Sequence, residues 1–180
     1  MIEKSESEFT KYVESCLPEM TVLVDSRERN NEHILRYFEK EKIPYEVKKL
    51  LFGDYSARLR DLPLEWTFAV ERKGSLQELA NNLSGDGWDR FGREIGATKR
   101  PFSHVQMALL LEDASMRDLF VRSWHYGGVT AETMRRFFFG VSVRYDVSLH
   151  FAEKAESGET VYYLLRETFR QKIRHGGINL

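Results

Sequence analysis

The stretch FAVERKGSLQELANNL, residues 68–83, changes its pattern near its centre. The apolar residues at 68–70 are typical of a strand, and Glu71, Arg72 and Lys73 follow them directly. From Leu76 onward the apolar residues recur at the three- and four-residue spacing of a helix. A strand that runs straight into a helix indicates an α/β protein.

The rest of the chain repeats this alternation. Apolar runs predict strands over residues 21–25, 45–52, 55–59, 64–70, 104–113 and 146–151. Helical spacing and turn residues predict helices over residues 30–42, 75–83, 88–98, 115–122, 130–144 and 159–174, and a loop over 123–128. The run 104–113 is apolar on both faces, as a central strand would be. We therefore expect a mixed sheet with helices on both faces.

Composition places the chain among globular proteins. Its 180 residues are 42% hydrophobic and 31% charged, which suits a single domain with its own core. The single cysteine excludes an internal disulfide and favours a reducing compartment. We find neither a membrane-length apolar run nor an apolar signal core, so we expect a cytoplasmic protein that is not secreted and has no membrane partner.

Charge is unevenly distributed between two predicted regions. Residues 1–20 carry a net charge of −3, and we interpret them as an acidic lead-in that is separate from a domain over 21–180. The whole chain has a formal charge of −1, so residues 21–180 carry +2. This balance is compatible with a local basic groove, although it does not require one.

Three acidic residues stand at predicted strand ends or turns. Asp25 closes the first strand, Asp54 follows Gly53, and Glu71 closes the fourth strand. Side chains alternate along a strand, so Glu71 and Lys73 should share one face. Two carboxylates can hold Mg²⁺, and a neighbouring lysine can stabilise a reacting phosphate. The residues therefore suit metal-assisted phosphodiester hydrolysis.

Structural interpretations of the same residues remain open. Glu71 and Lys73 could form an ordinary surface ion pair. Asp25 could make a hydrogen bond in a turn. Arg90 and Arg93 are three positions apart and share a helix face, which could be a solvated face or a phosphate contact.

Three short motifs follow one another along the chain in a specific order. They are VDSRE at residues 24–28, FGDY at 52–55 and VERK at 70–73, the last followed by a helix. In this order they resemble the XPF-type family of structure-specific nuclease domains, in its compact phage and prokaryotic form. The likeness extends to DRFGREIGATKR at 89–100 and ALLLED at 108–113, and so covers about residues 21–170.

The resemblance implies a restriction-endonuclease-like three-layer fold, a metal site and a set of site residues. The metal would be Mg²⁺, with Mn²⁺ as a substitute. Asp54 and Glu71 would be its ligands, Asp25 would add a carboxylate, and Lys73 would lie on the side of the catalytic base. The supporting and DNA-binding residues implied in the same way are Arg27 and Glu28 at the rim, Arg72 behind the site, and Arg90 and Arg93.

One position departs from the family pattern. The family usually has an aspartate four residues after the lysine, where this chain has Gln77. Glu78 could take that role if one residue were inserted. It could instead form a capping box with Ser75 at the start of the helix.

The resemblance implies an endonuclease that acts on branched DNA such as flaps, forks or junctions, in repair, replication or recombination. One alternative is a catalytically inactive XPF-like module that binds DNA or serves as a dimerisation partner. A second is an unrelated α/β protein whose surface charges imitate the motifs. We also expect a homo- or heterodimer that uses some of Phe137, Phe138, Phe139 and Tyr162.

Overall fold

The computed structural model describes residues 6–60, 62–63, 67–83, 105–121, 123 and 125–175. The strands in it are β1 (Met20–Asp25), β2 (Tyr45–Lys48), β3 (Tyr55–Leu59), β4 (Leu62–Pro63), β5 (Phe68–Lys73), β6 (Gln106–Glu112), β7 (His125–Tyr126), β8 (Val129–Thr130) and β9 (Val147–Ala152). The helices are α1 (Glu6–Cys16), α2 (Glu32–Lys40), α3 (Leu76–Leu83), α5 (Ala131–Tyr145) and α6 (Ser157–Arg174), with short 3-10 helices at η1 (Leu17–Glu19) and η2 (Asp118–Phe120).

The main sheet has the order β2-β1-β3-β5-β6-β9, and β4 pairs with β3. β1 and β2 are parallel, as are β5, β6 and β9, whereas β3 runs antiparallel to both of its long neighbours. The predicted mixed sheet is therefore confirmed. β6 lies inside the sheet and is buried from Met107 to Glu112, as its two-sided apolar pattern predicts, and β9 lies at the edge.

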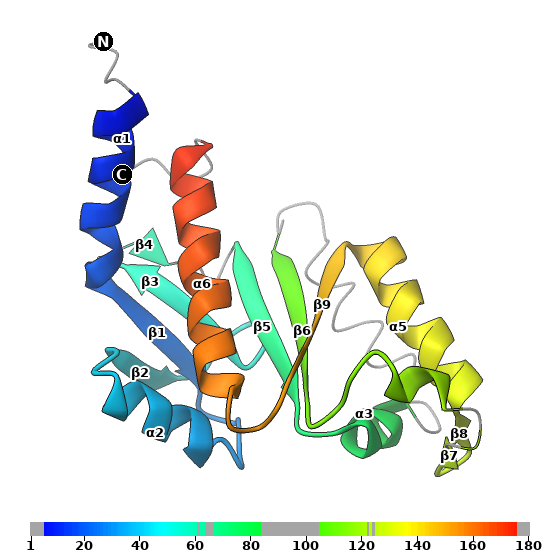
Figure 1. The fold of residues 1–180 in the computed structure, drawn as a ribbon. Helices are drawn as coiled ribbons and strands as arrows, with labels where there is room; N and C mark the ends of the chain where they lie inside the picture. The colour runs from blue at the N-terminus through cyan, green and yellow to red at the C-terminus, as the bar shows by residue number, and fades with distance from the viewer. Residues whose placement is uncertain are drawn as a thin grey trace.

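Helices cover both faces of the sheet (Figure 1). One core cluster joins the sheet to α1, α2 and α6, and includes Phe38 and Phe169. The other joins it to α3 and α5, and includes Leu79 and Phe138. The predicted three-layer α/β architecture is confirmed. α1 contributes the fully buried Val13 to the first cluster, so residues of the predicted acidic lead-in pack with the rest of the domain.

Two predicted segments are wrong in detail. The helix expected over 115–122 is only the 3-10 turn η2, because the Asp118 carboxylate accepts hydrogen bonds from the Ser115 amide and hydroxyl, each at 2.7 Å. The expected loop at 123–128 instead contains β7, which pairs with β8. Gly127 and Gly128 both have positive φ, as a two-residue hairpin turn requires.

Two other predicted segments lie partly or wholly outside the described residues. The strand expected over 64–70 begins at Phe68, and residues 64–66 lie outside the described residues, as does the expected helix at 88–98. The helix expected over 130–144 is α5, and it buries Met134, Phe137, Phe138 and Val141. Of the four residues named for a dimer, Phe137 and Phe138 are buried in the core of the domain, Tyr162 is half-buried and Phe139 is 44% exposed, and the dimer itself stays a prediction.

Gly53 has a conformation that its position demands. Its φ is +66°, and a Cβ atom there would lie 2.9 Å from both Ala69 Cβ and the Val70 carbonyl oxygen. The next residue, Asp54, donates its amide to that same carbonyl at 2.8 Å. The turn therefore needs both a positive φ and the absence of a side chain.

We predict that Gly53→Ala lowers the free energy of unfolding by about 2–4 kcal/mol, the sum of a left-handed backbone and an overpacked contact. Gly127→Ala is the matched control: its φ is +55°, but no atom of the described residues would lie within 4 Å of an added Cβ, so only the backbone cost of about 1–2 kcal/mol applies. Chemical denaturation of both variants measures the difference, and equal losses would contradict the close approach at Gly53.

Candidate active site

Strand register brings three carboxylates into one row. β1 and β3 pair Val24 with Tyr55, and β3 and β5 pair Tyr55 with Val70. The neighbouring positions in this register are Asp25, Asp54 and Glu71. The Asp25 amide donates to the Asp54 carbonyl oxygen at 2.8 Å, which continues the pairing by one residue. Glu71 lies within β5, which runs on to Lys73, and not at its end as expected.

The row opens into a cavity of about 420 Å³. It lies on the face of the sheet that α3 and α5 cover, since Met107 and Phe52 belong to both the cavity wall and that core cluster. The lining residues are Asp25, Arg27, Leu51, Phe52, Gly53, Asp54, Glu71 and Met107. The three predicted metal ligands thus share one cavity.

The Asp25 carboxylate accepts hydrogen bonds from two loop segments. Its side chain is 2% exposed, and its oxygens accept hydrogen bonds from the Arg27 amide (2.7 Å), Arg27 Nε and Nη2 (2.8 Å each) and the Leu50 amide (2.8 Å). Burial alone would raise the pKa of Asp25, but these hydrogen bonds outweigh it and the pKa is lowered. Asp25 is therefore an ionised anchor for the segments that carry Arg27 and Leu50.

Asp54 has the opposite electrostatic environment. Burial is the main reason that its pKa is raised well above the usual value, and the charges of Glu71 and Glu28 add to the effect. Lys73 and a 2.8 Å hydrogen bond from the Arg72 amide to Asp54 Oδ2 oppose the shift without cancelling it. A bound cation at this point would relieve the repulsion between Asp54 and Glu71.

Lys73 lies beside Glu71, as the alternation along β5 predicts. Its Nζ donates to Glu71 Oε1 at 2.6 Å, and the two side chains are 11% and 19% exposed. Burial would lower the pKa of Lys73, but the charges of Glu71 and Asp54 outweigh it, so the pKa is raised. Lys73 therefore stays a cation at neutral pH.

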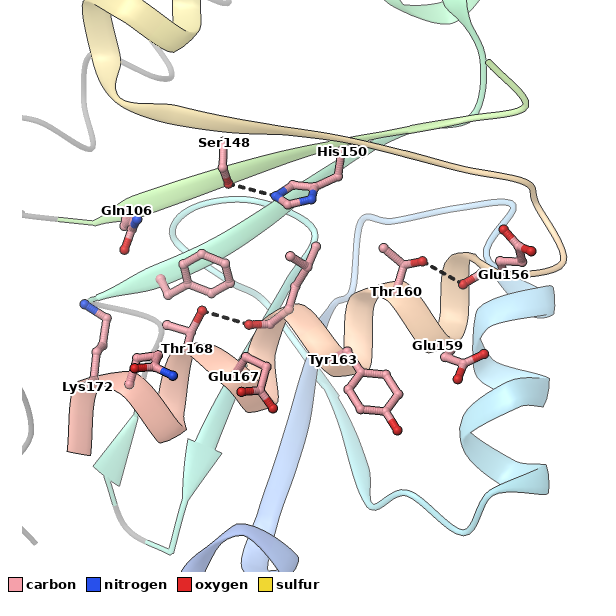
Figure 2. Close-up of a pocket in the computed structure, with 13 residues that line it drawn as sticks. Gln106, Ser148, His150, Glu156, Glu159, Thr160, Tyr163, Glu167, Thr168 and Lys172 are labelled. Atoms are coloured by element: carbon pink, nitrogen blue, oxygen red, sulfur yellow. Dashed lines mark hydrogen bonds between the residues drawn. The ribbon is translucent and has the colours of Figure 1, made fainter. Parts of the chain in front are cut away.

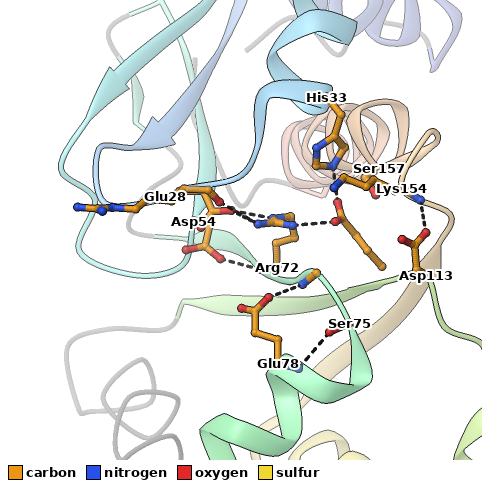
Figure 3. A network of polar contacts seen from close by, with 12 residues as sticks. Glu28, His33, Asp54, Arg72, Ser75, Glu78, Asp113, Lys154 and Ser157 are labelled. Carbon is orange, nitrogen blue, oxygen red and sulfur yellow. Dashed lines mark hydrogen bonds and ion pairs between the residues drawn. The ribbon is translucent and has the colours of Figure 1, made fainter.

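Arg72 points to the other face, where it forms a buried ion network (Figure 3). Its Nε donates to Glu28 Oε1 and its Nη1 to Glu112 Oε2, each at 2.7 Å, and Nη2 donates to the Arg29 carbonyl oxygen at 3.1 Å. The second Glu112 oxygen lies 2.7 Å from His33 Nε2. The network joins β5 and β6 to the start of α2.

Glu112 and His33 support the site through this network, and neither was predicted as a site residue. Glu112 is 1% exposed at the end of an apolar strand, and two signals were available for it: a charged residue that closes a buried run, and its place in the ALLLED motif. The partnership with His33 spans 79 positions and depends on how α2 docks, so no local pattern could reveal it.

Glu78 lies at the beginning of α3 in a hydrogen-bonded turn. Its amide donates to Ser75 Oγ at 3.1 Å, which is half of the predicted capping box. Its carboxylate accepts from the Gly74 amide at 2.8 Å instead of from Ser75. Both contacts favour the capping interpretation, and Gln77 beside it is exposed.

The residues present fit a metal bound by two carboxylates. Among the described residues there is no cluster of three or more His, Cys, Asp and Glu side chains arranged to hold a metal ion. Asp54 and Glu71 still supply hard oxygen donors in a cavity with room for water, and Mg²⁺ usually binds through one or two carboxylates with several waters. Asp25, whose oxygens already accept four hydrogen bonds, is the weaker candidate ligand.

Arg90 and Arg93, the predicted DNA-binding residues, lie outside the described residues.

A larger cavity lies elsewhere. It has a volume of about 790 Å³ and lies between α6 and the strands β5, β6 and β9, where Phe68 and His150 line it (Figure 2). Phe68 belongs to the core cluster on the face opposite the carboxylate row. None of the predicted site residues lines this cavity, so its size is no argument for catalysis there.

No described helix is long and apolar enough to cross a membrane.

Comparison with known proteins gives one family and a group of similar structures. The model of the ERCC4 domain matches residues 24–164. The structure of XPF from Aeropyrum pernix is 18% identical with a TM-score of 0.61, and covers 84% of this chain. The same protein in complex with DNA is 17% identical with a TM-score of 0.57, and also covers 84%. This chain spans 66% of the length of each of those chains. No curated protein sequence matches.

We predict opposite effects of neutralising the two neighbouring aspartates. A raised pKa means that Asp54 ionises less readily in the folded chain than in the unfolded chain. Its charge therefore lowers the free energy of unfolding above the raised pKa, and has no effect on it below the ordinary aspartate range. Without divalent metal, Asp54→Asn should therefore raise Tm at neutral pH and lose this advantage in acid. Asp25→Asn should lower Tm at neutral pH, because the lowered pKa of Asp25 makes its charge stabilising there.

Thermal unfolding at neutral and acidic pH tests both variants together. The Tm values of both should approach that of the unmodified chain as the pH falls. A lower Tm for Asp54→Asn at neutral pH would show that its carboxylate is not under repulsion.

We also predict that Arg72→Met lowers the free energy of unfolding by about 3–5 kcal/mol, because it leaves two buried carboxylates without their cation. Adding Glu112→Gln should restore part of the loss. Arg136→Met is the control: it breaks an ion pair whose arginine is 77% exposed, and should cost less than about 1 kcal/mol. Similar losses for the two single variants would refute the network's role.

Proposed function

This chain belongs to the ERCC4 domain family and contains an XPF-type nuclease domain, and we propose that it is a divalent-metal-dependent endonuclease that hydrolyses phosphodiester bonds in branched DNA. The observation that carries the proposal is that Asp54 and Glu71 line one cavity and Lys73 is paired with Glu71 at 2.6 Å. The carboxylate of Asp54 is under repulsion, and Lys73 keeps its positive charge. Branched substrates such as flaps, forks and junctions, and a role in repair, replication or recombination, belong to the proposal.

Asp54 and Glu71 are the proposed ligands of Mg²⁺, for which Mn²⁺ can substitute. When bound, the metal would supply Lewis-acid stabilisation of charge on the phosphate. Asp25 was predicted as a third ligand, and we now propose that it acts as an anchor, because its oxygens already accept four hydrogen bonds.

The chain's own residues provide the remaining chemistry. Lys73 holds a positive charge beside Glu71, where it can stabilise the negative charge that grows on the phosphate in the transition state. The raised pKa of Lys73 favours this role over that of a base. Arg27, whose side chain is 61% exposed at the cavity, can contact the phosphate while it remains paired with Asp25. Glu28 and Arg72 support the site from the opposite face of the sheet.

DNA contacts beyond the cavity are also proposed. We retain Arg90 and Arg93 as candidate phosphate contacts, since they follow the helix in the position where the family carries basic residues. A dimer remains proposed, and Phe139 is the exposed residue of the predicted set that could take part in it. The protein named XPF from Aeropyrum pernix has been solved in complex with DNA, which supports DNA as the partner proposed here.

The site predicts that binding and cleavage can be separated. Glu71→Gln and Asp54→Asn should abolish cleavage of a labelled DNA fork in Mg²⁺, and Lys73→Ala should slow it by about 100-fold or more. All three variants should still bind the fork, because each retains the cavity and Arg27 in its wall. A cleavage time course beside a binding assay in chelator measures both properties.

Two controls make this test specific. Glu78→Gln should keep activity and lose at most about 1 kcal/mol of stability, as a capping residue would. Mg²⁺ should raise the Tm of the unmodified chain and leave that of Asp54→Asn unchanged. Cleavage by Glu71→Gln at the unmodified rate would rule out the proposed site.

A further inference from the structure

The segment that joins β2 to β3 is fixed at both ends, and we call residues 50–53 the lip segment. At its beginning, the Leu50 amide donates to Asp25 Oδ2 at 2.8 Å, and the Leu50 carbonyl oxygen accepts from Arg27 Nη2 at 3.0 Å. At its end, Gly53 lies against Ala69 and the Asp54 amide bonds to β5. The backbone of the lip segment is therefore held in place from both sides.

The lip segment presents apolar side chains to the carboxylate cavity. Leu50 is 2% exposed, whereas the next side chain, Leu51, is 55% exposed and lines the cavity. Phe52 is half-buried, lines the same cavity and packs against the core cluster beneath it. A single exposed leucine needs no explanation on a protein surface. Leu51 differs because a fixed backbone directs it to the edge of a site lined by charged groups.

Two cationic side chains lie near these apolar residues. The Arg27 side chain, 61% exposed, lines the same cavity, and Lys49 precedes the lip segment and is exposed. The cavity thus combines carboxylates, a guanidinium group and three hydrophobic side chains, Leu51, Phe52 and Met107, within about 420 Å³. A ligand that matches this set has an anion next to a flat apolar face. A nucleotide of a DNA strand has both, in its phosphate and its base.

We propose that Leu51 and Phe52 form a base-packing subsite, which contacts the nucleobase next to the phosphate that Asp54, Glu71 and Lys73 act on. The inference rests on the proposed function and extends it. The subsite favours an unpaired base, since the face of a base in a duplex is covered by its stacked neighbours. It would fix the position of the strand along the carboxylate row, and so determine which bond is presented.

The chain offers a matched pair of variants for the test. Leu51 and Val47 are each 55% exposed, but only Leu51 lines the cavity. Leu51→Ala and Val47→Ala should therefore have similar effects on folding, which thermal unfolding verifies. Phe52→Leu is a second subsite variant that keeps an apolar group over the core.

The experiment measures binding of a fork DNA in chelator, with a single abasic site moved along the single-stranded arm near the junction. For the unmodified chain and for Val47→Ala, one abasic position should weaken binding by about tenfold, equivalent to about 1.4 kcal/mol, which lies at the lower end of the range for a base stacked on an aromatic side chain such as Phe52. Leu51→Ala should bind the intact fork about tenfold more weakly and lose most of its response to that abasic position. Phe52→Leu should give an intermediate response.

Equal binding and equal abasic profiles for Leu51→Ala and Val47→Ala would overturn the subsite. So would a profile in which no abasic position weakens binding by the unmodified chain. These readings need no cleavage, so they are independent of the assay that tests the proposed nuclease activity. A loss of cleavage register in Leu51→Ala, with products spread over neighbouring bonds, would further support the subsite.

Discussion

The buried guanidinium of Arg72 is the interaction on which the rest of the site depends. At 5% exposure it has lost almost all of its water, so its charge must be matched within the protein. Glu28, Glu112 and the Arg29 carbonyl oxygen provide that match. Since these groups come from the loop after β1 and the end of β6, one side chain ties together segments that are distant in sequence. The amide of the same residue holds Asp54, which connects this network to the carboxylate row.

Two aspartates that lie side by side have opposite pKa shifts, although burial alone would raise the pKa of both. Asp25 gains four hydrogen bonds and its pKa is lowered, so its charge stabilises the fold. Burial and the charges of Glu71 and Glu28 raise the pKa of Asp54, so its charge is held at a cost to stability. A carboxylate under repulsion in an open cavity is available to a cation, whereas one that is already saturated is not. Neighbours, and not residue type, therefore separate an anchor from a candidate ligand.

The sequence predicted those features that depend on local pattern. The burial of β6 follows from its continuous apolar run, and the buried face of α5 follows from the helical spacing of its apolar residues. The opposite directions of the Glu71 and Arg72 side chains follow from strand geometry. The contact between Glu112 and His33 could not be predicted, because it depends on the docking of α2 against the end of β6. The helix expected at 115–122 failed because the side chain of Asp118 satisfies the turn instead. In the same way, the Leu50 amide that donates to Asp25 is 25 positions away, and only the folded loops bring the two together.

The register of β1, β3 and β5 also determines where the chain can change its length during evolution. Pairing of Tyr55 with Val70 sets Asp54 against Glu71 whatever the number of residues between the two strands, and the entropic cost of a longer connection rises only slowly. Inside β5 the situation is reversed, since one inserted residue would exchange the faces of Arg72 and Glu71 and place a carboxylate where the guanidinium belongs. Insertions and deletions in homologous chains should accordingly collect between the motifs and spare the motifs themselves. A search for relatives should therefore fix the Glu-Arg-Lys triplet and leave its distance from the Gly-Asp turn free.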